Sequence, residues 1–301
     1  AIGAQAQTIA ALKTHAYLIV AHNEPKALHL LVSILDDARN HIYIHIDEKS
    51  RHLFIKEKIV SICSFSKVTF IPSIKVYWSG YSQIQVTLNL LQKAIANKHR
   101  YYHLISGVDL PLKSQDELHL FFQEHDGDEF VSGTKVTTWK TSTRFRYYHY
   151  EKLVAVIDRK ILRKLRYLLS AIQRLFFIDR TRGVDLIFYM GGNWFSITHD
   201  FARYLVQKKE FIRKTFNHGF FNDEILMPTM LFNSPFKNNV SKKMNLRYVD
   251  WKRGNPYVWR EQDYEELTSK DLFFARKFSY ENHPEIMEKL KRKLLSSDEK
   301  G

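Results

Sequence analysis

The feature that most constrains the fold is a regular alternation of strand-like and helix-like segments over about the first 125 residues. The apolar runs rich in strand formers are residues 15–22, 41–47, 67–71 and 101–105. The segments with helical spacing of apolar residues are 26–38 and 82–96. This alternation predicts an α/β fold with a mostly parallel central sheet and crossover helices.

Polar residues come directly after several of these predicted strands. In a parallel sheet, ligands bind at the carboxyl ends of the strands. His22, Asp47 and Asp109 occupy such ends, so they are candidates for a binding site. For Asp47 two interpretations stay open on the residues alone: a turn or helix-cap residue, or a carboxylate that accepts bonds from a nucleoside.

The chain is strongly basic. Its 301 residues carry a formal net charge of +14, which attracts an anionic partner such as nucleic acid, an anionic membrane or a phosphorylated small molecule. The length and the 45% hydrophobic content suit one large α/β domain or two small ones. Cys63 is the one cysteine, which fits a reducing compartment. No apolar stretch approaches the roughly 18–20 residues of a membrane span.

Several function classes lack their sequence motifs. No G-x-G-x-x-G follows a predicted strand and no phosphate-binding G-x-x-x-x-G-K-[ST] occurs, which weighs against dehydrogenases and P-loop NTPases. The 14 histidines form no H-E-x-x-H and no Cys/His cluster, which weighs against a zinc enzyme. A nucleic-acid-binding protein remains the alternative that the charge suggests, although no known nucleic-acid motif is present.

Asp126-Gly127-Asp128 matches the D-x-D pattern that holds a metal and a nucleotide diphosphate in many glycosyltransferases. It falls in a polar, acidic turn after a predicted helix, and three-residue patterns arise easily by chance. We favour a surface turn, and we keep a metal-dependent D-x-D glycosyltransferase as an alternative.

The second half contains carboxylates and cations in less ordinary positions. Asp223-Glu224 begins the helix predicted at 223–232, ahead of its apolar run, where the helix dipole alone would favour two carboxylates. Residues 272–278 set Arg276 and Lys277 inside a nearly continuous apolar run. Cations in such surroundings are usually paired, because burying a lone charge is costly.

The middle of the chain is basic and aromatic. Residues 144–150 are predicted as a loop, and residues 159–177 as a basic amphipathic helix. That helix either lies on an anionic membrane by its apolar face or packs on the domain with a solvated basic face. A strand broken by Gly191-Gly192 is predicted at 189–198, and a charged helix at 285–295.

Seven segments, taken in order, resemble the core 2/I-branching β-1,6-N-acetylglucosaminyltransferase family, to which peptide xylosyltransferases belong. They are residues 41–50 (HIYIHIDEKS), 76–89 (VYWSGYSQIQVTLN), 101–113 (YYHLISGVDLPLK), 190–198 (MGGNWFSIT), 222–227 (NDEILM), 246–251 (LRYVDW) and 272–278 (LFFARKF). Each segment alone is a weak match to the family, but seven matches in the same order over residues 15–280 are a specific indication of it.

The resemblance implies a GT-A-type single domain at 13–282. Its Rossmann-like, nucleotide-binding half would span 13–125 and its acceptor and catalytic half 126–282, followed by a charged helix and tail at 283–301. The implied activity is inverting transfer of a sugar, expected to be N-acetylglucosamine, from a UDP-sugar to a glycan hydroxyl. No metal or other cofactor is expected.

The resemblance also assigns roles to residues. Glu224 matches the catalytic base of the family's Ser-Pro-Asp-Glu-type motif, although Phe221-Asn222 replace its first two positions. Lys277 matches a diphosphate-binding lysine, and Arg260 is the best match for the accompanying arginine. The matches to nucleoside contacts are Val20, His22, Asp47 and Tyr77. On the acceptor side, Trp251 matches an aromatic position of the family. The family's charged acceptor-binding segment has no clear counterpart here; Arg144 and Arg146 occupy that region, and Asp109 at its strand end is the further substrate candidate.

Animal members of this family have membrane anchors and several disulfides, which this sequence lacks. We therefore expect a bacterial member that works in the cytoplasm, peripheral on the inner face of the membrane. Its acceptor would be a glycan or lipid-linked glycan in polysaccharide biosynthesis. An anionic membrane surface is the further partner considered, and nucleic acid is not expected.

Overall fold

The computed structural model describes residues 14–149 and 159–298. Its centre is a five-stranded sheet in the order β3-β2-β1-β4-β8. The strands are β1 (His15–Ala21), β2 (Asn40–Ile46), β3 (Lys67–Phe70), β4 (Tyr101–Ser106) and β8 (Ser196–Thr198). The first four are mutually parallel and β8 pairs antiparallel with β4. The predicted α/β fold with a mostly parallel sheet is confirmed.

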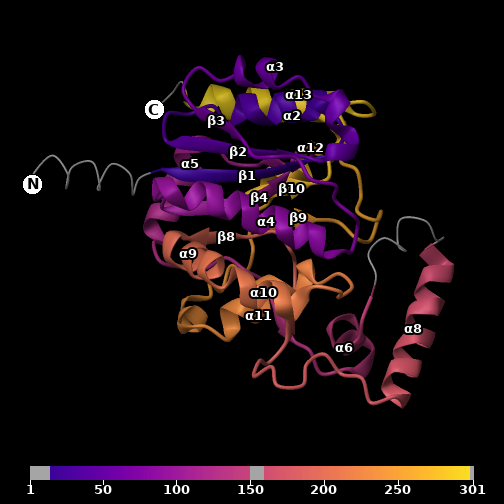
Figure 1. Ribbon diagram of the computed structural model, residues 1–301. Coiled ribbons are helices and arrows are strands. Elements are labelled where there is room, and N and C mark those ends of the chain that lie inside the picture. The colour runs from indigo at the N-terminus through magenta and orange to yellow at the C-terminus, as the bar shows by residue number, and fades with distance from the viewer. Residues whose placement is uncertain (1–13, 150–158, 299–301) are drawn as a thin grey trace, which may run out of the picture.

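Helices cover both faces of this sheet (Figure 1). On one face lie α2 (Pro25–Ile34), α5 (Gln115–Glu124) and α13 (Pro284–Asp298), whose apolar residues share one core. The opposite core contains residues of α4 (Tyr81–Ala94), α9 (His199–Gln207), α10 (Lys209–Phe216) and α11 (Asp223–Phe232). Because both faces are covered, every residue of β2 and β4 is buried, as expected for central parallel strands.

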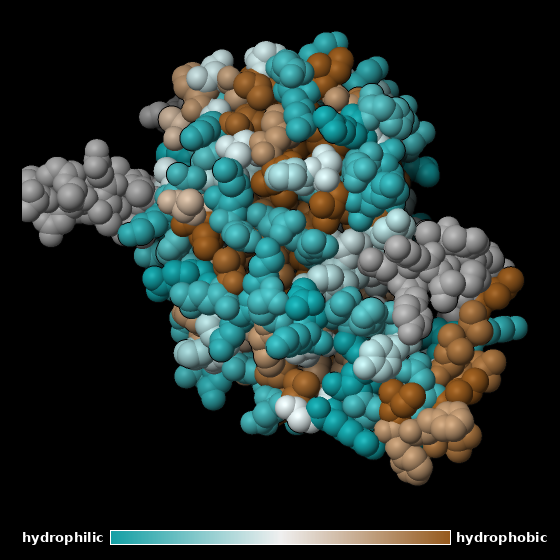
Figure 2. All heavy atoms as spheres, viewed as in Figure 1, coloured by the Kyte–Doolittle hydropathy of each residue, from teal (hydrophilic) through white to brown (hydrophobic). Residues whose placement is uncertain are grey.

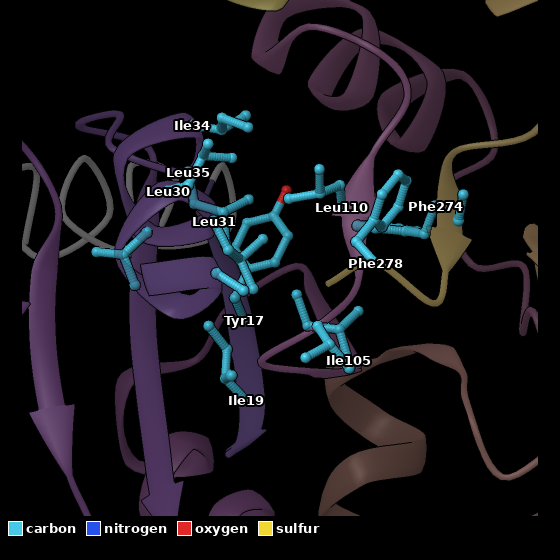
Figure 3. Close-up of a cluster of buried hydrophobic side chains, with 14 of the residues drawn as sticks. Tyr17, Ile19, Leu30, Leu31, Ile34, Leu35, Ile105, Leu110, Phe274 and Phe278 are labelled. Carbon is cyan, nitrogen blue, oxygen red and sulfur yellow. The ribbon is translucent and has the colours of Figure 1, made fainter. Parts of the chain in front are cut away.

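The first core joins sequence-distant segments. Figure 3 shows Tyr17 of β1 between the apolar residues of α2 and the pair Phe274 and Phe278. All three aromatic side chains are buried, and the Tyr17 hydroxyl donates to Gln115 Oε1 at 3.3 Å. This packing holds the C-terminal segment against the first strand of the sheet.

Short strands form two small accessory sheets. One has the order β5-β10-β9, from Leu110–Pro111, Phe274–Arg276 and Arg247–Val249. The other pairs β6 (Thr134–Lys135) with β7 (Tyr189–Met190). Strands of two or three residues carry too little pattern to be recognised in a sequence. In the first of these sheets, Arg276 of β10 pairs with Val249 of β9.

The C-terminal helix is part of this packing. In α13, Ile286, Met287, Leu290 and Leu294 are buried in the same core as α2. The predicted charged helix, which the sequence prediction sets apart from the domain at 13–282, thus contributes an apolar face to the first core.

The middle of the chain contains the main departure from the predicted elements. The expected loop at 144–150 is wrong at its start, because Arg144 and Arg146 form the last turn of α6 (Trp139–Arg146), while Tyr150 lies outside the described residues. Thr138 caps α6, because its side-chain oxygen accepts from Thr141 N. This capping residue is a local helix signal in a segment that is otherwise basic and aromatic.

The remaining elements are short except for α8. The 3-10 turns are η1 (Glu48–Leu53), η2 (Ile95–Asn97), η3 (Pro235–Asn239) and η4 (Glu261–Asp263), and the further helices are α3 (Lys56–Val60), α8 (Arg159–Leu175) and α12 (Tyr264–Ser269). In Figure 1, α8 stands beside α6 at the edge of the molecule. Within the described part of the chain, no helix is long and apolar enough to span a bilayer.

Candidate active site

A cavity of about 990 Å³ opens at the carboxyl edge of the central sheet. Val20 and His22 at the end of β1 line it, together with Ser106 at the end of β4. β1 pairs with β2 on one side and with β4 on the other, so the chain order of the strands reverses there. Ligands of open α/β sheets bind at such a reversal.

The predicted nucleoside contacts form one wall. The Asp47 carboxylate accepts from Lys49 N at 3.0 Å and from Val76 N at 3.4 Å, and Lys49 Nζ lies 3.5 Å from its other oxygen. Asp47 is therefore the cap of η1 and a cavity residue at once, so both interpretations of it are compatible. Tyr77 lies beneath Lys49 Nζ, 5.2 Å from the ring centre, and does not line the cavity.

Charges gather around His22. Burial lowers the pKa of His22, the Asp47 carboxylate raises it, and the cations Lys277, Arg276 and Lys49 lower it. The cations around His22, and not its imidazole, are the groups that would attract an anionic ligand.

Glu224 lies on the opposite wall, in the first turn of α11. Its Oε2 accepts from Arg144 Nη1 at 2.6 Å, and 39% of its side-chain surface is exposed. The Arg144 guanidinium also lies 5.5 Å from the Phe221 ring centre. The carboxylate is thus oriented by a cation and open to a ligand.

A proline and a glycine fix the turn that carries Glu224. Pro228 lies inside α11 and has no N–H, so the helix cannot use the Glu224 carbonyl, four residues earlier. That carbonyl instead accepts from Gly191 N at 2.8 Å. A Cβ at Gly191 would lie 1.9 Å from the Ser132 carbonyl oxygen, so this approach requires glycine. The glycine break in the sequence therefore joins β7 to the turn of Glu224.

Asp223 is a second carboxylate at this turn. Burial, and after it the neighbouring Glu224 charge, raise the pKa of Asp223 to about 7. Asn193 Nδ2 donates to Asp223 Oδ2 at 3.2 Å, whereas Oδ1 has no hydrogen-bond partner in the described structure. A carboxyl of this kind can donate a hydrogen bond to a ligand near neutral pH.

Arg276 contributes a cation to the cavity lining. It stacks over Trp194 at 4.3 Å from the ring centre, and its Nε lies 3.6 Å from Asp109 Oδ1. Asp109 is buried behind it and accepts from Ser106 N and Oγ, at 2.8 and 2.6 Å. The predicted substrate residue Asp109 does not line the cavity, and its position is that of a support for Arg276.

Arg247 lies deeper in the same lining. It is 8% exposed and donates to Ser196 Oγ and to the carbonyls of Asn245, Leu104 and Phe195. Burial lowers the pKa of Arg247 to about 9, and Asp109 opposes that effect. Its hydrogen bonds tie β4, β8 and β9 together, which is a structural role beside any contribution to the cavity's potential.

The other predicted site residues are spread more widely. Trp251 lines the cavity and is 65% exposed, whereas Lys277, Arg260 and Arg146 do not line it. Lys277 is half-buried, and its charge reaches His22. Arg260 is exposed over Tyr257, and Arg146 pairs with Asp179 at 3.3 Å.

Sequence reasoning gave no site role to several lining residues, among them Lys49, Trp78, Trp194 and Arg276, although Arg276 stood out as a cation in an apolar run. All four lie inside segments that carried the family resemblance, which is the signal that could have found them. Trp78 packs edge-on against Phe221 at 4.5 Å, and Phe221 N donates to the Ser79 carbonyl at 2.9 Å. These contacts join the two walls.

The D-x-D candidate lies elsewhere. Tyr101, at the amino end of β4, donates through its hydroxyl to the Asp128 carbonyl at 3.0 Å. Asp126 and Asp128 are thus at the sheet edge opposite to the cavity, and neither lines it. Among residues 14–149 and 159–298, no group of three or more His, Cys, Asp or Glu is placed to hold a metal ion.

Comparison with known proteins finds similarity to sugar-transferring enzymes. Rat xylosyltransferase 2 is 22% identical over 309 aligned residues, which cover 94% of this chain and 34% of the relative. The human N-acetyllactosaminide beta-1,6-N-acetylglucosaminyl-transferase is 24% identical over 196 residues, covering 64% of this chain and 45% of the relative. The chain thus spans a third to a half of the length of these relatives.

Among solved structures, Staphylococcus aureus TarS 1-349 in complex with UDP has 15% identity and a TM-score of 0.29, covering 45% of this chain and 40% of that one. The profile of the family described as "Branch: Core-2/I-Branching enzyme" matches residues 15–273, which is most of the sequence. This chain therefore belongs to the core-2/I-branching enzyme family.

Proposed function

We propose that the chain is an inverting glycosyltransferase that moves a sugar, N-acetylglucosamine in the first instance, from a UDP-sugar to a glycan hydroxyl. The observation that carries the proposal is the composition of one cavity. An oriented, accessible carboxylate, Glu224, lies on one wall, while Lys49 and Arg276 supply cations on the others. Family membership supports the same reaction class.

The chemistry follows from these positions. Glu224 takes the proton from the acceptor hydroxyl as its oxygen forms a bond to the anomeric carbon. The bond from that carbon to the diphosphate breaks at the same time, and UDP leaves with the electron pair. One displacement from the opposite face inverts the configuration at the carbon.

Charge that develops on the departing diphosphate requires nearby cations. Arg276 and Lys49 line the cavity, and Lys277 lies close enough for its charge to act on His22. Together they could supply this stabilisation by side chains alone, so we propose a reaction that needs no metal ion. Val20, His22 and Asp47 would hold the nucleoside at the strand ends. The exposed Trp251 would meet the acceptor.

The decisive experiment replaces the base and keeps its shape. Glu224→Gln should lower the transfer rate by about 10²- to 10⁴-fold, because general base catalysis contributes that much. UDP binding should persist, since the amide retains the size of the carboxylate. Transfer would be measured with UDP-N-acetylglucosamine, UDP-xylose and UDP-glucose, and UDP binding by calorimetry.

Full transfer by Glu224→Gln would refute the assignment of the base. If the wild-type protein does not bind UDP, the proposed function itself is refuted. Lys277→Ala separates the two roles further, because it should weaken UDP binding while Glu224→Gln does not.

A further inference from the structure

Helix α8 packs against the rest of the molecule through a polar side. Arg166 is 8% exposed, and its Nη1 donates to Thr143 Oγ1 of α6 at 2.8 Å. Its guanidinium also lies 4.9 Å from the Phe220 ring centre. Ser170, one turn further along, is fully buried on the same side. Surface helices of globular proteins usually do the opposite and bury their apolar side.

The outer side of α8 is apolar. Leu168, Ile172 and Leu175 follow helical spacing along one face and are 58%, 42% and 73% exposed. Phe176 and Phe177 extend this face beyond the helix at 69% and 77% exposed. Figure 2 shows a brown, hydrophobic strip at the lower right, where Figure 1 places α8. A contiguous exposed apolar strip of this kind marks an interaction surface.

The charges beside this strip have one sign. Residues 159–178 contain six Lys or Arg and no Asp or Glu. Of these, Lys164 and Arg174 are exposed, and the Arg174 guanidinium lies 5.7 Å from the ring centre of Trp139, itself 39% exposed. Apolar side chains flanked by cations match the boundary between acyl chains and anionic headgroups.

We propose that α8 and Phe176-Phe177 dock this protein on an anionic membrane surface. The apolar strip would enter the acyl boundary, and the basic residues would contact headgroup phosphates. A second copy of the chain fits this surface less well, because a symmetric contact through it would bring two sets of cations together.

The inner side of α8, opposite to the docking face, is connected to the cavity by short contacts. Arg166 of α8 bonds α6 and stacks on Phe220. Phe220 N donates to the Arg144 carbonyl at 2.8 Å, and Arg144 holds Glu224. A membrane bound through α8 would therefore lie next to the acceptor side of the cavity. The docking itself does not depend on the proposed function.

The test is vesicle co-sedimentation of the full chain. One set of vesicles contains phosphatidylglycerol and phosphatidylcholine in equal parts, and the other contains phosphatidylcholine alone. We expect binding to the first set only, weakened by salt. The triple variant Leu168→Ser/Ile172→Ser/Phe176→Ser should abolish it. The variant Lys160→Ala/Arg163→Ala/Lys164→Ala should weaken it about 10-fold or more.

The matched control removes exposed apolar side chains elsewhere. Val60, Phe65 and Leu120 are 46%, 71% and 58% exposed, and the triple serine variant at these positions should bind vesicles normally. Thermal melting verifies that each variant is folded. The proposal is overturned if wild-type protein ignores anionic vesicles, if the α8 variant still binds them, or if that variant only dissolves a dimer seen by light scattering.

Discussion

At the scale of single residues, the site depends on two adjacent carboxylates with different surroundings. Glu224 accepts from Arg144 and is 39% exposed, whereas Asp223 accepts from Asn193 and keeps a buried Oδ1 without a partner in the described structure. Their adjacency at a helix start is all that the sequence shows, and the helix dipole would explain it equally well. The tertiary contacts, from Arg144, Gly191 and Asn193, distinguish the two groups.

Asp223 predicts a pH-dependent stability. Its pKa is raised from 3.8 to about 7 in the folded protein, mainly by burial. Between these values the folded chain keeps a proton that the unfolded chain releases, so stability falls as the pH rises through this window. The loss is about 4 kcal/mol at most above pH 7. Asp223→Asn removes this pH-dependent destabilisation. The Tm of the variant should therefore exceed that of wild type by more at pH 8 than at pH 5.

The measurement is thermal melting of both proteins at the two pH values. Gln262→Ala, an exposed substitution without a titratable group, is the control and should shift Tm equally at both. An Asp223→Asn gain that is the same at pH 5 and pH 8 would show that Asp223 does not titrate in this range.

At the scale of elements, α6 and α8 form a unit attached to the edge of the molecule. The cation Arg166 of α8 joins them through its hydrogen bond to Thr143 of α6. Amphipathic periodicity predicts α8, whereas the last turn of α6 falls within the loop predicted at 144–150. A short helix with an N-cap threonine has little periodicity to recognise.

Arg166→Ala should release α8 without unfolding the domain. Loss of one charged, buried hydrogen-bond donor should raise hydrogen exchange in α8 by about 10-fold or more. Exchange in β1 and β4 should stay unchanged, because both strands belong to the central cores. Mass spectrometry of peptides from α8, β1 and β4 tests this, with the exposed Lys164→Ala as the control. Equal exchange in α8 of wild type and variant would exclude Arg166 as the anchor.

At the scale of the whole molecule, the sheet separates a functional edge from a structural one. The cavity lies at the carboxyl ends of β1, β2 and β4. Asp126-Gly127-Asp128 lies at the amino end of β4, where Tyr101 bonds the Asp128 carbonyl. Asp126 is an exposed partner of Arg100 at 3.8 Å. This acidic turn and the proposed reaction site therefore lie at opposite ends of β4.

The double variant Asp126→Asn/Asp128→Asn should retain sugar transfer within about twofold, because surface substitutions away from a site have small effects. Transfer should also persist in EDTA. Activity assays with and without EDTA and Mn²⁺ test both statements. A strict requirement for Mn²⁺, lost in the double variant, would favour the metal-dependent alternative.

Much of the architecture is determined by local pattern. The buried parallel strands, α4 and α11 follow from apolar runs and helical spacing, because these elements must bury continuous or periodic apolar faces. The placement of His22 and Asp47 at strand ends follows as well, since parallel strands share one carboxyl edge. The ordered family segments added the identity of Glu224 as the candidate base.

Only the tertiary structure decided which cations surround the cavity and which side of α8 faces outward. Arg276 lines the cavity whereas Arg260 does not, because β10 pairs with β5 and β9 far away in the sequence. In α8, the sequence determines that one face is apolar and the other basic. Which face is buried depends on contacts between distant segments, among them those of Arg166 with Thr143 and Phe220 and that of Gln173 with Tyr148. Local periodicity contains no information about such contacts.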